Sequence, residues 1–119
     1  MIIYNAEVNG ELKTVVTDGG KIISVEENRQ SGDINAEGCR LIPGLIDVHT
    51  HGCIGMDTMD ANFEPMCRFY AEHGTTSFLP TTMTMGYDSL LKVVNAKTDF
   101  AGANILGFHF EGPYISEKH

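Results

Sequence analysis

Two histidines stand two residues apart at the end of an apolar stretch, in the segment Leu41–Gly52. Side chains of a β-strand alternate between its faces, so Asp47, His49 and His51 would share one face. The opposite face, which would pack under helices, carries Ile46, Val48 and Thr50. Neutral imidazoles are good ligands for Zn, Fe and similar divalent ions. We therefore predict that the two histidines bind a metal at the carboxyl end of a strand, and that Asp47 orients an imidazole without being a ligand.

A second strand-like segment, residues 104–111, ends in a glutamate followed by Gly-Pro. Alternation predicts that Glu111 lies on the same face of the strand as His109, together with Ile105 and Gly107. The opposite face, against helices, would carry Leu106, Phe108 and Phe110. First and third strands of a parallel sheet lie about 10 Å apart, and barrel curvature brings their inner side chains together. We predict that Glu111 is a metal ligand, and that His109, one step deeper, is a hydrogen-bonded core histidine.

The other chemistry-bearing side chains have ordinary explanations. Cys53 is expected to be an inert thiol, and His73 a helix-terminal residue without a special role. His119, the last residue, has no predicted role. Three threonines follow the second predicted strand, where they would either line a pocket or belong to a polar loop: Thr81, Thr82 and Thr84. We identify no general acid or base.

Two zones position these residues. Residues 1–43 are predicted to form short strands, with a hairpin turn at Asp18-Gly19-Gly20 and a further short strand at Leu41–Ile42. From residue 44, strands at 45–51, 75–79 and 104–111 alternate with two helices. The first helix, 63–73, has an apolar stripe of Phe63, Met66, Cys67 and Tyr70. The second, ending at Val94, would be capped by Asp88.

This alternation indicates an α/β fold with a parallel sheet. We predict a small β-sandwich segment (1–43) followed by the first part, about three strands, of an incomplete (β/α)8 metallo-hydrolase barrel (44–119). The chain would then be the N-terminal piece of a longer protein, inactive alone and prone to self-association. A small independent α/β domain is the alternative.

Composition excludes several classes of partner. The 119 residues carry 16 acidic and eight basic side chains, a formal charge of −8, so nucleic acid and anionic membranes are not expected partners. No apolar run approaches the ~20 residues of a membrane span. The amino-terminal residues lack the basic region of a signal peptide. Three cysteines without a CxxC pair favour a reducing cytoplasm.

Three blocks resemble the amidohydrolase superfamily and, within it, the family of N-acetylglucosamine-6-phosphate deacetylases. They are residues 43–52, continued by 55–61, then 74–82, and finally 107–114. The first block is common to many amidohydrolases. The third is more particular to the deacetylases, in which its glutamate is a metal ligand, and it maps onto Glu111. The resemblance implies one or two divalent ions, Zn or Fe, and a homodimer when the protein is intact.

The implied reaction is hydrolysis of the acetamide of a small-molecule phosphosugar, N-acetylglucosamine 6-phosphate, to glucosamine 6-phosphate and acetate. Some members replace both histidines of the first block and hold one metal at the glutamate. Because His49 and His51 are present here, a second metal position is available. The family's later histidine ligands, catalytic aspartate and phosphate contacts have no counterpart in the 119 residues, and His119 does not match the family's Lys-Gly-x-His segment.

Two alternatives remain open at this point. The chain could belong to another amidohydrolase, such as a dihydroorotase-like or deaminase-like enzyme. Those enzymes usually rely on a carboxylated lysine or a histidine from a later strand, so Glu111 favours the deacetylase. Alternatively, it could be a non-catalytic metal-binding or structural module.

Overall fold

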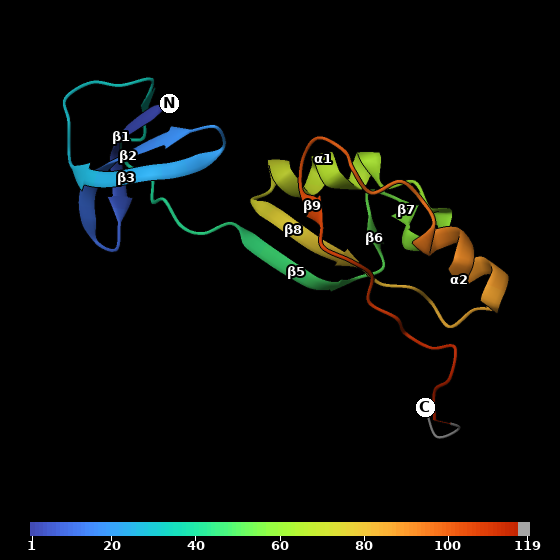
Figure 1. Ribbon diagram of the computed structural model, residues 1–119. Coiled ribbons are helices and arrows are strands. Elements are labelled where there is room, and N and C mark those ends of the chain that lie inside the picture. The colour runs from blue at the N-terminus through green and yellow to red at the C-terminus, as the bar shows by residue number, and fades with distance from the viewer. Residues whose placement is uncertain (117–119) are drawn as a thin grey trace. The chain divides into compact units, whose positions relative to one another are not determined.

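The computed structural model describes residues 1–116. The chain divides into two compact units, with the boundary in the sequence between Pro43 and Gly44. Figure 1 shows the course of the chain through both units. No helix within residues 1–116 is long and apolar enough to cross a membrane.

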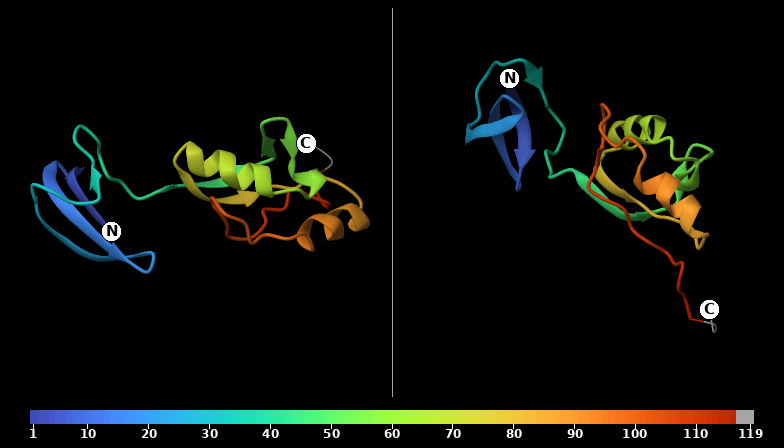
Figure 2. Two further views of the ribbon diagram at one scale, coloured as in Figure 1. Left: turned by 90° about the horizontal axis from the view of Figure 1, so that it is seen from above. Right: turned by 45° about the vertical axis from the view of Figure 1, so that its right-hand side comes forward.

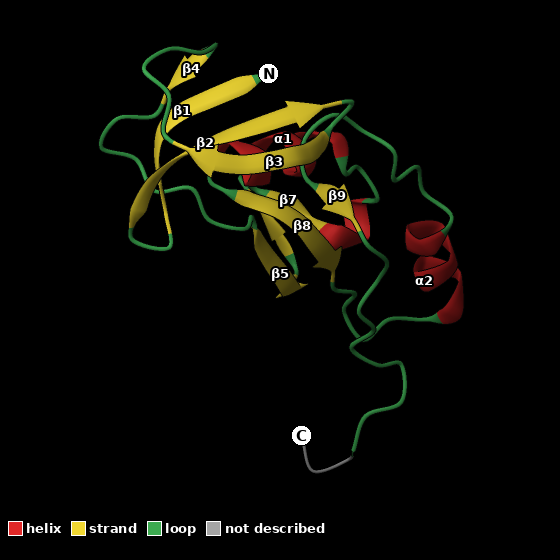
Figure 3. Ribbon diagram, turned by 60° about the vertical axis from the view of Figure 1, so that its left-hand side comes forward, coloured by secondary structure: helices red, strands yellow, loops and turns green. Residues whose placement is uncertain are grey.

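The first unit is a four-stranded sheet in the order β3-β2-β1-β4 (Figure 3). Its strands are β1 (Ile2–Val8), β2 (Glu11–Asp18), β3 (Lys21–Glu27) and β4 (Ile34–Asn35). The β2–β3 hairpin turns at Gly19 and Gly20, which both have positive φ, as a tight two-residue turn requires. The predicted hairpin is therefore confirmed.

The predicted strand at Leu41–Ile42 is wrong. Pairing in this segment is limited to a single bridge between Glu7 and Arg40, and to the Leu41 amide donating to the Glu7 carbonyl. Pro43, which follows directly, has no amide proton with which to extend such a ladder.

The second unit is built around a parallel sheet in the order β5-β8-β9. Its strands are β5 (Leu45–Thr50), β8 (Thr75–Pro80) and β9 (Asn104–Ile105). Helix α1 (Glu64–Glu72) connects β5 to β8, and α2 (Tyr87–Val94) connects β8 to β9. Between β5 and α1 lie a small hairpin and a 3-10 turn: β6 (Gly52–Cys53), β7 (Met56–Asp57) and η1 (Thr58–Asp60). The predicted strand–helix alternation is confirmed.

Helix α1 covers one face of this sheet (Figure 2). Its predicted apolar stripe is buried, as residues Phe63, Met66, Cys67 and Tyr70. The Tyr70 ring lies 4.6 Å from the ring of Phe78, the fully buried aromatic residue of the central strand β8. This contact ties the helix to the middle of the sheet.

Helix α2 begins earlier than predicted. Gly86 is its N-cap, so the predicted capping role of Asp88 is wrong. Asp88 lies in the first turn, where its carboxylate is favoured by the positive end of the helix dipole.

The faces of β5 do not follow the predicted alternation. Ile46 and Val48 are each 60% exposed, whereas Thr50 is buried and hydrogen-bonded to the Tyr70 hydroxyl of α1. The pairing of β5 with β8 shifts register between Asp47 and Thr50, which breaks the period of two. The prediction that these three residues pack together under helices is therefore wrong for Ile46 and Val48.

The third predicted strand is also interrupted. Regular pairing covers only β9, and it resumes as one bridge between Thr81 and His109. Between them Gly107 adopts a φ of +154°, which other residues rarely adopt. Ile105 and Phe108, three residues apart, both pack against the core under α1. The predicted faces are therefore wrong for Ile105 and for the largely exposed Leu106 and Phe110.

We expect the 119-residue chain to self-associate, because β5 is an edge strand of the described sheet and exposes Ile46 and Val48. Light scattering should show dimers or larger species. Ile46→Lys should shift the population towards monomer. Ile22→Lys, the same change at an exposed isoleucine of the first unit, should not. Equal effects of both substitutions, or a wild-type monomer at all concentrations, would contradict this assignment.

The three cysteines should differ in reactivity. Cys39 is exposed, Cys53 half-buried and Cys67 buried. Burial raises the pKa of Cys67, and it raises the pKa of Cys53 against an opposing hydrogen bond from Tyr70. A raised pKa lowers the fraction of reactive thiolate at a given pH.

Alkylation by iodoacetamide at pH 7, followed by peptide mass spectrometry, should therefore modify Cys39 first, Cys53 next and Cys67 last. Raising the pH to 9 should accelerate the two slower sites. Modification of Cys53 as fast as that of Cys39 would contradict the prediction that it is an inert thiol.

Candidate metal centre

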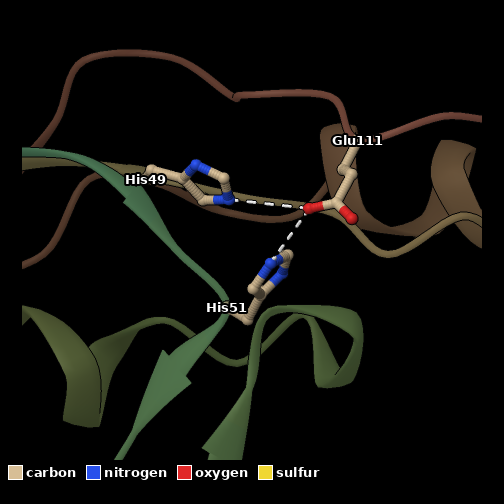
Figure 4. A group of neighbouring side chains, drawn as sticks. All are labelled: His49, His51 and Glu111. Carbon is tan, nitrogen blue, oxygen red and sulfur yellow. Dashed lines mark ion pairs between the residues drawn. The ribbon is translucent and has the colours of Figure 1, made fainter. Parts of the chain in front are cut away.

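Two imidazoles and one carboxylate converge at the carboxyl edge of the parallel sheet (Figure 4). The Nε2 atom of His49 lies 3.5 Å from Oε2 of Glu111, and Nε2 of His51 lies 3.2 Å from the same oxygen. All three side chains are partly exposed, and their ligand atoms lie within 4.8 Å of one another. The structure thus brings together the three residues that were predicted as ligands.

This donor set fits a divalent ion. Ligand atoms at 2.0–2.1 Å from a tetrahedral zinc ion are separated by about 3.4 Å. The two nitrogen–oxygen distances, 3.5 and 3.2 Å, bracket that separation. Two imidazole nitrogens and a carboxylate oxygen are a set that Zn and Fe accept.

His51 is oriented by the main chain of the neighbouring strand. Its Nδ1 atom donates to the carbonyl oxygen of Thr81 at 3.1 Å. A carbonyl oxygen only accepts hydrogen bonds, so Nδ1 carries a proton and Nε2 is the ring nitrogen left to bind a metal beside Glu111. Such a contact is the usual way in which a metal-binding histidine is fixed in one tautomer.

The backbone between the two histidines is anchored to α1. The Thr50 hydroxyl is hydrogen-bonded to the hydroxyl of Tyr70, and the Tyr70 hydroxyl donates to the carbonyl of Gly52 at 3.4 Å. Burial raises the pKa of Tyr70, although the hydrogen bond with Thr50 opposes this effect. The phenol therefore stays protonated and able to donate at neutral pH.

The threonines that follow β8 hold the site together, a role that the sequence left open. Thr81 and Thr82 are fully buried. The Thr81 hydroxyl accepts from the Thr50 amide at 3.0 Å, and the Thr82 hydroxyl accepts from the Glu111 amide at 3.3 Å. The Thr84 hydroxyl donates to the Glu111 carbonyl at 3.2 Å. In the sequence, the feature that could have indicated this role was the position of the threonines directly after the central strand of a parallel sheet.

Gly112 permits the close approach of Thr84 to the chain after Glu111. Its φ is +90°, and an added Cβ would lie 2.7 Å from Oγ1 of Thr84 and 3.0 Å from its Cα. Any other residue would be strained and would displace Thr84 from the Glu111 carbonyl.

Asp47 differs from the prediction. Its Oδ1 atom accepts from the backbone amide of His49 at 3.0 Å, so the carboxylate fixes the main chain and does not orient an imidazole. His109 is hydrogen-bonded as predicted, with Nδ1 3.3 Å from Oγ1 of Thr81, but it is only partly buried.

The remaining candidates lie elsewhere. Cys53, on β6, is not part of the cluster. His73 is exposed at the end of α1, with Nδ1 2.7 Å from the Phe69 carbonyl oxygen. His119 lies outside the described residues.

The chain is similar to known proteins over both units. A family model described as the amidohydrolase family matches residues 40–118. An N-acetylglucosamine-6-phosphate deacetylase of Bacillus subtilis is 38% identical over 92% of this chain. Enzymes with the same name are the subjects of two solved structures that are similar in fold to this chain.

The Thermotoga maritima structure has a TM-score of 0.79 and 30% identity over 99% of this chain. The Pasteurella multocida structure has a TM-score of 0.81 and 27% identity over 98% of it.

The chain spans 29% of the Bacillus subtilis protein, and 34% and 35% of the two solved chains. The likeness in fold confirms the prediction that the parallel β-α-β-α-β unit is part of an amidohydrolase barrel. Since the family model covers well over half of the residues, including all three candidate ligands, the chain belongs to the amidohydrolase family.

Proposed function

We propose that His49, His51 and Glu111 hold a divalent ion, Zn or Fe, in a protein that hydrolyses the acetamide of N-acetylglucosamine 6-phosphate. The observation that carries the proposal is the convergence of both imidazoles on one oxygen of Glu111. The similar proteins support the substrate, since those of Bacillus subtilis, Thermotoga maritima and Pasteurella multocida are all named N-acetylglucosamine-6-phosphate deacetylase.

The bound ion would lower the pKa of a water molecule and polarise the amide carbonyl. This chain's residues would bind and orient the ion. His51 is fixed in one tautomer by the Thr81 carbonyl, and the Glu111 main chain is held by Thr82 and Thr84. In the family that the chain resembles, the general base is an aspartate on a later strand of the barrel, so we assign that role to none of residues 1–116.

The proposal extends to the setting of the site. Residues 1–43 would be a segment of the small β-sandwich, and residues 44–119 the first part of the barrel. The intact enzyme would be a homodimer that takes a small phosphosugar and has no nucleic-acid or membrane partner. A cytoplasmic location is supported by the free cysteines, one of them exposed.

Glu111→Gln tests the metal assignment in the protein that contains this chain. An amide oxygen is a weaker ligand and does not offset the charge of the ion. We expect the variant to lose its main metal and to show a kcat reduced by about a hundredfold or more, equivalent to at least ~2.7 kcal/mol in barrier height. Elemental analysis and acetate release from N-acetylglucosamine 6-phosphate, on the same preparations, provide the measurements.

Two comparisons sharpen the result. Glu72→Gln, which removes a carboxylate from the exposed end of α1, should leave metal content and rate unchanged. His49→Gln combined with His51→Asn should be milder than Glu111→Gln, because some relatives carry replacements at both positions. Full metal content and full rate in the Glu111→Gln variant, beside an inactive double histidine variant, would place the main site on β5 alone and refute the proposal.

A further inference from the structure

The two candidate histidine ligands are held in different ways. His51 donates a hydrogen bond from Nδ1 to a backbone carbonyl. His49 has Nε2 near Glu111, but its Nδ1 atom has no hydrogen-bond partner among residues 1–116. Its side chain is half-exposed. Since Nδ1 has no hydrogen bond, a packing contact is needed to fix the orientation of the ring.

The ring of His109 supplies that contact. The His49 and His109 ring centroids lie 4.6 Å apart at an interplanar angle of 90°. The corresponding contact between His49 and His51 is longer, at 5.3 Å and 73°. A perpendicular contact at 4.6 Å is a favourable edge-to-face arrangement of aromatic rings. It restricts rotation of the His49 ring about its own side-chain bond.

His109 is itself firmly fixed. Its amide donates to the Pro80 carbonyl at 3.0 Å, and its carbonyl accepts from the Thr82 amide at 3.0 Å. Its Nδ1 atom lies 3.3 Å from the hydroxyl of buried Thr81. Backbone and ring are thus both attached to the segment that follows the central strand β8.

We propose that His109 is a positioning residue, which holds the imidazole of His49 in the orientation that metal binding requires. The inference rests on the proposed metal site. His109 does not belong to the group whose ligand atoms lie within 4.8 Å of one another, and its Nδ1 is engaged with Thr81. It therefore acts through His49, as residues behind metal ligands commonly do.

The first test needs no metal. In NMR spectra of the 119-residue chain, the carbon-bound ring protons of His49 should be displaced by the ring current of His109. His109→Ala should abolish that displacement, and His109→Phe, which keeps an aromatic ring, should retain one. The signals of His73 serve as the control, because its ring contacts Phe69 and not His109. Unchanged His49 signals in His109→Ala would overturn the proposal.

The second test measures Co²⁺ affinity of the same chain by competition with a chromophoric chelator. His109→Ala should weaken binding about 10- to 100-fold, the effect typical of residues behind a metal ligand. His109→Phe should stay within about twofold of wild type. In the His49→Ala background, His109→Ala should change affinity by less than about twofold, whereas in the His51→Ala background it should keep its full effect.

Each other outcome has a meaning. If His109→Ala weakens Co²⁺ binding to its full extent in the His49→Ala background, the positioning role is overturned. An equal loss in His109→Phe and His109→Ala would identify His109 as a ligand and would also overturn it. If the wild-type chain binds no Co²⁺, the three residues do not hold a metal by themselves, and the metal-free spectra alone decide whether His109 positions His49.

Discussion

The candidate site depends on the hydrogen bonds of one buried residue, Thr81. Its amide donates to the Thr50 carbonyl at 2.7 Å, and its hydroxyl accepts from the Thr50 amide at 3.0 Å. Its carbonyl accepts from His51, and its hydroxyl contacts His109. A buried polar atom left unpaired costs roughly 1–3 kcal/mol. Loss of any of these hydrogen bonds would therefore destabilise the site. Thr81 therefore fixes the end of β5 and the segment around His109 relative to β8.

This arrangement separates the residues that would bind a metal from the strand that positions them. β5 and the residue directly after it supply the imidazoles, and the segment after β9 supplies the carboxylate of Glu111. The central strand β8 supplies no ligand, but the threonines after it hold both neighbours. The carboxyl ends of parallel strands meet at one edge, so residues far apart in the sequence reach the same point.

The sequence predicted the clustering of His49, His51 and Glu111 better than it predicted the packing around them. These three candidate ligands could be named because metal-binding residue types stand at the ends of predicted strands, where irregularities within a strand matter little. Alternation failed between Val48 and Thr50, where β5 shifts register against β8, and at Ile105, where Gly107 interrupts the third strand. Such shifts arise from pairing with a distant strand, which no local pattern contains. The contacts of Thr81 were unpredictable for the same reason.

Local charge at the site can differ from the charge of the chain. The formal net charge of −8 is unfavourable for an anionic phosphosugar over long distances, but screening limits that effect to about 8–10 Å at physiological ionic strength. One carboxylate and two neutral imidazoles would leave a divalent ion with a net charge of about +1. Asp47, the acidic residue of β5, has a carboxylate oxygen that accepts from the His49 amide, and it is not in the ligand cluster. In the proposed site, the donor set would therefore hold an ion without cancelling the positive charge that would attract an amide oxygen and acidify a water molecule.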